Sequence, residues 1–109
     1  MAHAIGYVTK TKNGGFNGEL AMMSLKKNIT ILPNSNKKTK KQPDFRVYTQ
    51  DKVEIGGGWK RTGKASGNPY ISLTLAAPEF GSKKIYENLG QACDQNDKDV
   101  MAILWHPED

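Results

Sequence analysis

The sequence has almost none of the residues that build covalent cross-links or membrane spans. It contains one cysteine, Cys93, so no disulfide can form within the chain, which fits a reducing compartment. No segment approaches the roughly 20 consecutive apolar residues of a membrane span, and no signal-peptide pattern opens the chain. We therefore expect a soluble, cytoplasmic protein that makes no contact with a membrane.

Catalytic and metal-binding motifs are also missing. There is no Walker loop, HExxH, paired CxxC, nucleophile elbow or EF-hand pattern. The two histidines, His3 and His106, lie at opposite ends of the chain, and the acids that follow Cys93 would suppress its thiolate. Isolated acids such as Glu79 and Glu87 are in most cases solvated surface groups. We expect no enzyme activity, no metal and no cofactor, and a small hydrolase is the weakest alternative.

Acidic residues are scarce in the middle of the chain. The formal net charge is +5, but residues 37–64 hold nine Lys or Arg against three acids, a net +6, whereas residues 65–109 carry a net −4. A concentrated basic segment is typical of proteins that bind polyanions. The alternative is that the charge only keeps the protein soluble and gives weak nonspecific association, which charge alone explains equally well.

What the sequence has in abundance is alternation of apolar and polar residues, which is typical of strands with one buried face. The length of 109 residues and the apolar fraction of 37% predict one domain, residues 1–109, with a thin core. A short helix is expected at 85–92, where Ile85, Leu89 and Ala92 share a helical face. Strands are expected at residues 3–9, 16–22, 28–32, 45–49, 53–61, 70–75 and 100–105. The expected fold is all-β, a small antiparallel barrel or sandwich of about seven strands with one short helix.

A lysine-rich stretch separates the third and fourth expected strands. Residues 34–42 contain no large apolar side chain, and they carry four lysines that repel one another: Lys37, Lys38, Lys40 and Lys41. We expect this segment to be disordered unless an anion neutralises it. A second flexible tip, rich in Gly and Ser, is expected at residues 62–68 and carries Lys64.

Alternation also assigns side chains to the two faces of each strand. Phe45 and Val47 are core positions, as are the apolar residues at 71, 73 and 75, and this leaves Arg46, Tyr48 and Tyr70 outward. If sequential strands are neighbours, one outer face presents these three residues together with Lys60.

The fifth expected strand contains three successive glycines, at positions 56–58. If the alternation of the strand continues unbroken through the glycines, Trp59 lies on the same face as Val53 and Ile55. This predicts a buried Trp59 and an outward Lys60. A bulge at the glycines would reverse that parity.

Basic side chains interleaved with aromatic rings make a platform for single-stranded nucleic acid, because cations follow the phosphates and rings stack on bases. The alternative is that the tyrosines are ordinary surface residues or lie in a dimer interface. The candidate nucleic-acid-binding residues are Lys37, Lys38, Lys40, Lys41, Arg46, Tyr48, Lys60, Arg61, Lys64 and Tyr70.

Six blocks of the sequence, in this order, resemble a known family. They are IGYVTKTKNGGFNGEL at 5–20, PDFRVY at 43–48, VEIGGGWKRT at 53–62, PYISLTL at 69–75, PEFGSKKIYENL at 78–89 and ILW at 103–105. In these six blocks the chain resembles the domain-of-unknown-function family seven-three-six. That family consists of short bacterial proteins, frequently encoded on plasmids and integrating conjugative elements. The resemblance implies a mobile-element setting and no assigned activity. The basic stretch at 36–41 is longer and more basic than the family pattern, and LAAPEF at 75–80 lacks two acids of that pattern.

The residues and the resemblance together predict a non-catalytic nucleic-acid-binding accessory protein of a mobile genetic element, with single-stranded DNA as the favoured ligand. The alternative is a protein-interaction module or inhibitor that docks on an acidic surface of a host or conjugation complex. The thin core and the outward aromatic residues further predict a homodimer, formed through a strand edge or a sheet face.

Overall fold

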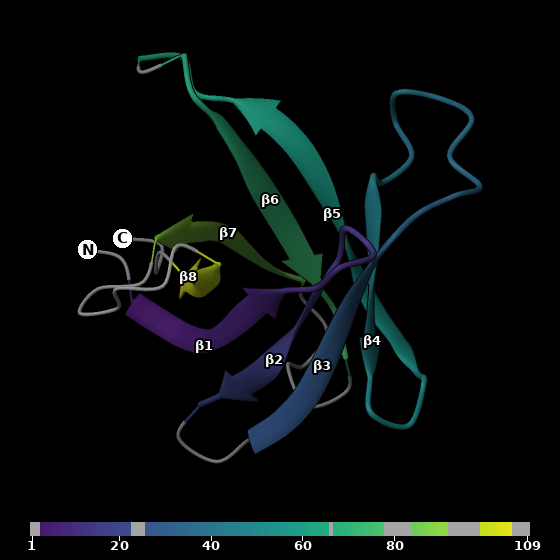
Figure 1. The fold of residues 1–109 in the computed structure, drawn as a ribbon, viewed down its shortest axis with the longest axis vertical. Coiled ribbons are helices and arrows are strands. Elements are labelled where there is room, and N and C mark those ends of the chain that lie inside the picture. The colour runs from purple at the N-terminus through teal and green to yellow at the C-terminus, as the bar shows by residue number, and fades with distance from the viewer. Residues whose placement is uncertain (1–2, 23–25, 66, 78–83, 92–98, 106–109) are drawn as a thin grey trace.

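In the computed structural model the strands of the chain run antiparallel and close into a barrel (Figure 1). The structure describes residues 3–22, 26–65, 67–77, 84–91 and 99–105. The eight strands found in these ranges are β1 (His3–Lys10), β2 (Phe16–Ala21), β3 (Lys26–Pro33), β4 (Phe45–Thr49), β5 (Glu54–Thr62), β6 (Pro69–Leu75), β7 (Ile85–Gln91) and β8 (Val100–Trp105).

Each strand pairs with the next, and β8 pairs back with β1, where Trp105 lies opposite His3. The predicted all-β class is therefore confirmed, as a barrel rather than a sandwich. Closure leaves no edge strand in the described barrel, so dimerisation through a strand edge does not suit this fold. A dimer through a sheet face stays a prediction. None of the described segments forms a helix able to cross a membrane.

The helix expected at 85–92 is wrong, because residues 85–91 form strand β7 and position 92 lies outside the described residues. Ile85 and Leu89 are four residues apart, a spacing that also places two side chains on one face of a strand. They face Leu75 and Ile71 of β6 respectively. The inward position between them is Glu87, and its polar character hid the strand alternation.

The interior of the barrel is filled almost entirely by aliphatic side chains. Its most deeply buried members are Val8, Leu20, Ile29, Ile31, Val47, Leu73, Leu75 and Ile103. Burial of each large side chain stabilises the fold by about 1.5–3 kcal/mol. Phe16 and Phe45 meet edge to face, with ring centroids 6.1 Å apart. The predicted core positions of β4 and β6 are confirmed, although position 71 is only partly buried.

A bulge in β5 changes the register of its pairing with β4. Val47 lies opposite Gly56, but the next residue, Tyr48, lies opposite Glu54, so Ile55 is an extra residue in β5. Only glycine fits next to it, because a Cβ at Gly56 would lie 2.0 Å from a carbonyl oxygen of β6. The bulge therefore follows from the glycine run.

Beyond the bulge, the even-numbered residues of β5 face inward and the odd-numbered ones face outward. Lys60 pairs with Ile71 on the inner side, and Trp59 pairs with Ser72 on the outer side. The predictions of a core Trp59 and an outward Lys60 are therefore wrong, and the alternative with a bulge is right. Val53, also expected in the core, precedes β5 and is 57% exposed.

Candidate nucleic-acid interface

The basic loop, residues 34–44, joins β3 to β4 and is folded, which contradicts the expected disorder (Figure 1). The backbone N–H of Asn34 donates to the carbonyl of Asp44 at 2.9 Å and so closes the loop. Within it, the side-chain oxygen of Gln42 accepts a hydrogen bond from the backbone N–H of Thr39 at 3.1 Å. Polar side chains of the loop thus satisfy part of its own backbone.

Asp44 fastens the basic loop to β5. Its two carboxylate oxygens accept hydrogen bonds from the Lys37 ammonium at 2.6 Å and from the backbone N–H of Lys60 at 2.8 Å. Its own N–H donates to the carbonyl of Gly58 at 2.8 Å. The hydrogen bond from Lys37 lowers the pKa of the Asp44 carboxyl, and the one from the Lys60 N–H adds to this. Lys37 therefore has a structural partner within the protein.

The other three lysines of the basic loop are Lys38, Lys40 and Lys41, and no carboxylate in the described ranges forms an ion pair with them. The backbone of Lys41 contacts β5 directly, because its carbonyl accepts a hydrogen bond from the indole N–H of Trp59 at 3.1 Å. The hydrogen bond to Trp59 thus fixes the position of the loop that carries Lys38, Lys40 and Lys41.

Trp59, Arg61 and Tyr70 form what we call the outer cluster, on the outer face of β5 and β6. Arg61 lies directly opposite Tyr70, and Trp59 is two residues before Arg61 on the same face. The edge of the Trp59 ring lies 3.3 Å from where a Cβ of Gly57 would be, so the indole rests on bare backbone. The ring is half-buried as a result.

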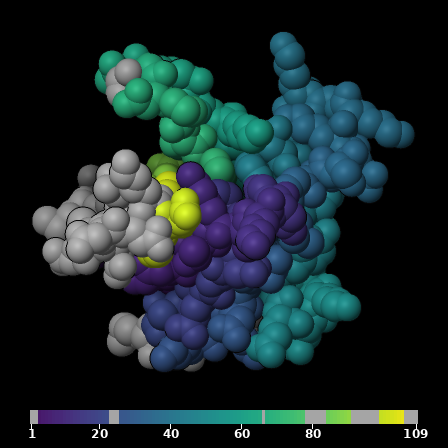
Figure 2. Space-filling model, viewed as in Figure 1, coloured from purple at the N-terminus to yellow at the C-terminus, as the bar shows by residue number. Residues whose placement is uncertain are grey.

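The basic loop and the β5–β6 hairpin extend from the same end of the barrel. Figure 2 shows them as two separate projections with a notch between them, the loop in blue and the hairpin in teal and green. Lys64 lies in the turn of that hairpin, between β5 and β6. The structure therefore brings six predicted site residues to one end of the barrel. They are Lys38, Lys40, Lys41, Arg61, Lys64 and Tyr70.

Of the other predicted platform residues, Tyr48 lies away from this cluster, whereas Arg46 lines a hollow together with Trp59. Tyr48 is on the outer face opposite Glu54, whereas Tyr70 is opposite Arg61 at the other end of β5. Six to seven residues of strand separate these positions, roughly 20 Å at about 3.3 Å per residue. Arg46 is paired with Glu54, with 3.0 Å between Nη1 and Oε2.

Lys60 also lies outside the expected platform, because it follows the inner parity of β5. Its ammonium lies 5.7 Å from the centroid of the Phe45 ring, at the end of the barrel, where the lysine itself is exposed. Trp59 takes the place on the outer face that sequence parity gave to Lys60. The glycine run was the signal that could have identified it.

The remaining candidate groups for chemistry are few. The described residues contain no group of three or more His, Cys, Asp or Glu side chains that could hold a metal ion. Cys93, Glu79 and His106 lie outside the described residues. Glu87, expected to be solvated, is 2% exposed, and desolvation raises the pKa of its carboxyl to about 8.

The family model described as Protein of unknown function (DUF736) matches residues 4–108. The chain belongs to this family. The resemblance carried by the six sequence blocks is thereby confirmed. No curated protein and no solved structure matches the chain.

Within this DUF736 chain, the outer cluster comes from two of the blocks that carry the family resemblance. Trp59 and Arg61 belong to VEIGGGWKRT, and Tyr70 belongs to PYISLTL. In this chain the barrel wall therefore supplies the aromatic surface, and the basic loop adds charge to it.

Proposed function

We propose that this protein is a non-catalytic nucleic-acid-binding accessory protein, with single-stranded DNA as its favoured ligand. The observation that carries the proposal is the hydrogen bond from Trp59 to Lys41. It joins the outer cluster to a loop with three lysines that have no ion-pair partner among the described residues. The mobile-element setting rests on the family resemblance alone.

The outer cluster has the chemistry that single strands require. Trp59 and Tyr70 offer ring faces on a rigid strand pair, and each base stacked on an aromatic ring contributes about 1–3 kcal/mol. Arg61, opposite Tyr70, offers a guanidinium that can bind a phosphate or stack on a base. A duplex hides its base faces, so this surface favours an unpaired strand.

The basic loop supplies attraction that does not depend on base sequence. Lys38, Lys40 and Lys41 have no ion-pair partner in the described part of the chain, so their ammonium groups are free to bind phosphates. Phosphate contacts of this kind release counterions and depend strongly on salt. Loop and cluster therefore divide the binding energy into a salt-sensitive part and a salt-resistant part.

A protein-interaction module is the second candidate function, and two exposed aromatic side chains favour it. Tyr86 of β7 is 62% exposed and Tyr7 of β1 is 49% exposed, both on outer faces of the barrel. Exposed aromatic side chains are enriched at protein interfaces. Exposed rings on an outer face of the sheet also suit a homodimer formed through that face.

Fluorescence anisotropy with labelled oligo-dT, at two salt concentrations, tests the proposed function. We expect binding at low salt that weakens, but persists, at the higher concentration. Polyglutamate serves as a competitor, because binding through charge alone would be displaced by any polyanion. Absence of binding at low salt, or complete displacement by polyglutamate, would overturn the proposal in favour of a protein partner.

A further inference from the structure

Arg46, Gly57 and Thr74 lie side by side on the outer face of three neighbouring strands. Gly57 of β5 pairs with Arg46 of β4 on one side and with Thr74 of β6 on the other. Because glycine has no side chain, the outer layer of side chains has a gap at this point. A hollow of about 210 Å³ forms here, and its lining includes Glu54 and Trp59. This volume lies below the roughly 300 Å³ of the smallest ligand clefts, so it suits a single flat ring.

Glu54 and Trp59 stand at the two ends of the hollow along β5. Trp59 follows Gly57 by two residues on the outer face. Glu54 precedes Gly57, and the bulge at Ile55 brings it opposite Tyr48, which also faces outward. Trp59 belongs to the outer cluster as well, so a strand that stacks on that cluster would bring its neighbouring base to the hollow.

The charged side chains of the hollow carry both signs. Nη1 of Arg46 and Oε2 of Glu54 form an ion pair at 3.0 Å, and the exposed Lys84 also lines the hollow. The contact joins one nitrogen to one oxygen, so Nη2 of Arg46 and Oε1 of Glu54 can turn to a ligand. A carboxylate repels a phosphate, and a neutral base therefore suits this hollow better than a phosphate does.

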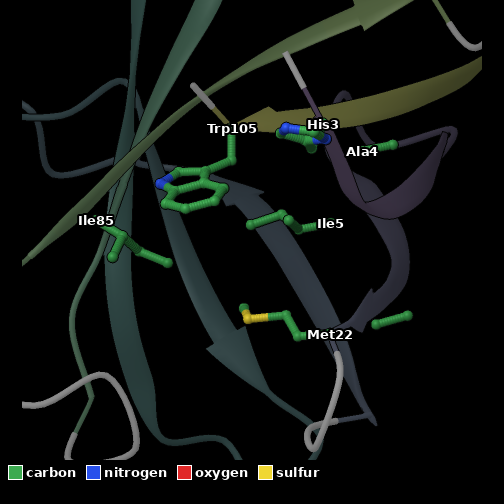
Figure 3. Close-up of a pocket in the computed structure, with 7 residues that line it drawn as sticks. His3, Ala4, Ile5, Met22, Ile85 and Trp105 are labelled. Atoms are coloured by element: carbon green, nitrogen blue, oxygen red, sulfur yellow. The ribbon is translucent and has the colours of Figure 1, made fainter. Parts of the chain in front are cut away.

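A larger cavity, of about 630 Å³, lies at the end of the barrel where β1 begins and β8 ends. Figure 3 shows the side chains of Ile5, Met22, Ile85 and Trp105 turned toward one common space. The polar side chain of this described lining is His3, whose ring centroid lies 6.5 Å from that of Trp105. The same lining contains no pair of opposite charges that could read the edge of a base, so the smaller hollow is the better candidate.

We propose that the hollow between Arg46 and Thr74 binds a guanine base of a single strand, an inference that rests on the proposed nucleic-acid function. Of the four DNA bases, guanine alone presents two adjacent donors, N1–H and the N2 amino group, next to an acceptor, O6. The two carboxylate oxygens of Glu54 can accept from both donors, and Oε2 keeps its bond to Arg46 because a carboxylate oxygen accepts two hydrogen bonds. Arg46 can donate to O6 through Nη2.

The other bases match the charge pair less well. Thymine has one donor, N3–H, between two acceptors. Adenine and cytosine each offer one amino group beside a ring acceptor. With any of these bases one oxygen of the Glu54 carboxylate would stay unmatched, and a site built to bond a group discriminates against a ligand that lacks it.

Fluorescence anisotropy with four labelled nonamers of dT tests this proposal, with dG, dC, deoxyinosine or dT at the central position. We expect the dG nonamer to bind at least about fivefold more tightly than the other three, because a bidentate contact discriminates between bases to this extent. Deoxyinosine is the sharpest comparison, since it lacks only the N2 amino group of guanine. Equal or tighter binding of the dC or deoxyinosine nonamer would overturn the guanine pocket and leave the proposed function standing. Failure of all four nonamers to bind would overturn both.

GMP serves as a competitor, because it carries the same base without a strand. We expect it to displace the dG nonamer only at concentrations well above the dissociation constant of that nonamer, since it lacks the contacts to the basic loop and the outer cluster. Displacement near that constant would show a site for the free nucleotide and overturn the assignment to a strand.

Two variants that each remove one negative charge separate recognition of the base from electrostatics. Glu54→Gln should lose the preference for dG over dT, because an amide offers one accepting oxygen in place of two. Its affinity for the all-dT nonamer should not fall, and this affinity also shows that the variant is folded. Glu19→Gln, on β2, should keep the preference. A Glu54→Gln variant that keeps the preference, or a Glu19→Gln variant that loses it, would contradict the assignment to Glu54.

Discussion

The indole N–H of Trp59 donates a hydrogen bond to the backbone carbonyl of Lys41, 3.1 Å away. Trp59 belongs to the barrel wall and Lys41 to the basic loop, so this bond sets a stacking surface beside ammonium groups that have no ion-pair partner in the described part of the chain. Rings on a rigid wall lose little conformational freedom on binding, whereas lysine side chains lose more. The two parts of the site should therefore respond differently to mutation and to salt.

Tyr70→Ala should weaken binding of oligo-dT by about 1–3 kcal/mol, because one stacking ring is removed. The slope of log affinity against log salt should stay nearly unchanged, since the variant keeps every group that binds a phosphate. The matched control is Tyr48→Ala, which also removes a tyrosine from an outer face. Tyr48 belongs to β4 and lies opposite Glu54, at the far end of β5 from Tyr70. Equal losses for the two variants, measured by anisotropy, would show that the outer cluster is not the site.

Replacing Lys38, Lys40 and Lys41 with Gln should flatten the salt dependence of binding. The slope should fall by about 0.7 for each phosphate of a single strand that the loop no longer neutralises. The control replaces Lys26, Lys27 and Lys52, which removes the same charge from the opposite end of the barrel. A control variant that flattens the slope as much would mean that net charge, rather than the loop, drives binding.

Asp44→Ala should release the basic loop, because the two hydrogen bonds that its carboxylate accepts can no longer form. Trypsin should then cleave after the loop lysines faster than in the wild type, while Asp51→Ala, in the turn between β4 and β5, should leave the rate unchanged. An unchanged rate in Asp44→Ala would contradict the anchoring role.

The protonation of Asp44 gives a second measurement of the same interaction. Its folded-state pKa is lowered from 3.8, so its contribution to stability is present above that pH and is lost as pH falls through the folded pKa. The Lys60 amide, which donates to Asp44, should report this titration as a shift of its NMR signal with a midpoint below 3.8. A midpoint above 3.8 would exclude the hydrogen bond from Lys37 in solution.

Glu87 should make the protein less stable as pH rises. Its folded pKa of about 8 lies above its ordinary value of 4.5, so the folded state binds the proton more tightly than the unfolded state. The free energy of unfolding should therefore fall between pH 4.5 and pH 8, by up to about 5 kcal/mol at about 1.4 kcal/mol per pH unit. Glu87→Gln should match the wild type near pH 4.5 and exceed its stability at pH 8, measured by urea unfolding. Glu19→Gln, on the outer face of β2, should keep the wild-type slope, and a wild-type slope in Glu87→Gln would contradict the account.

Sequence alone predicted the strands whose alternation is unbroken. Phe45 and Val47 of β4, and the apolar positions of β6, alternate cleanly, so their faces and their neighbours could be assigned. In β5 the extra residue Ile55 reverses the alternation, and nothing in the order of residues says that the reversal occurs at this position. In β7 Glu87 occupies a core position, where an acid is least expected.

The site was predicted in its parts but not in its arrangement. Charge repulsion among the lysines predicted disorder, whereas hydrogen bonds made by Asn34, Gln42 and Asp44 fold the loop, and these depend on the three-dimensional path of the chain. Tyr48 and Tyr70 were both placed outward correctly. Their separation along β5 depends on register, which the order of residues does not determine.

An NMR titration with oligo-dT tests the central claim most directly, because the two tryptophans give separate indole N–H signals at opposite ends of the barrel. We expect the indole signal of Trp59 and the amide signals of Arg61 and Tyr70 to shift on binding. The indole signal of Trp105 and the amide signal of Tyr48 should stay in place. Shifts confined to Trp105 and the surrounding cavity, or no shifts at a concentration where anisotropy reports binding, would contradict the outer cluster as the nucleic-acid site.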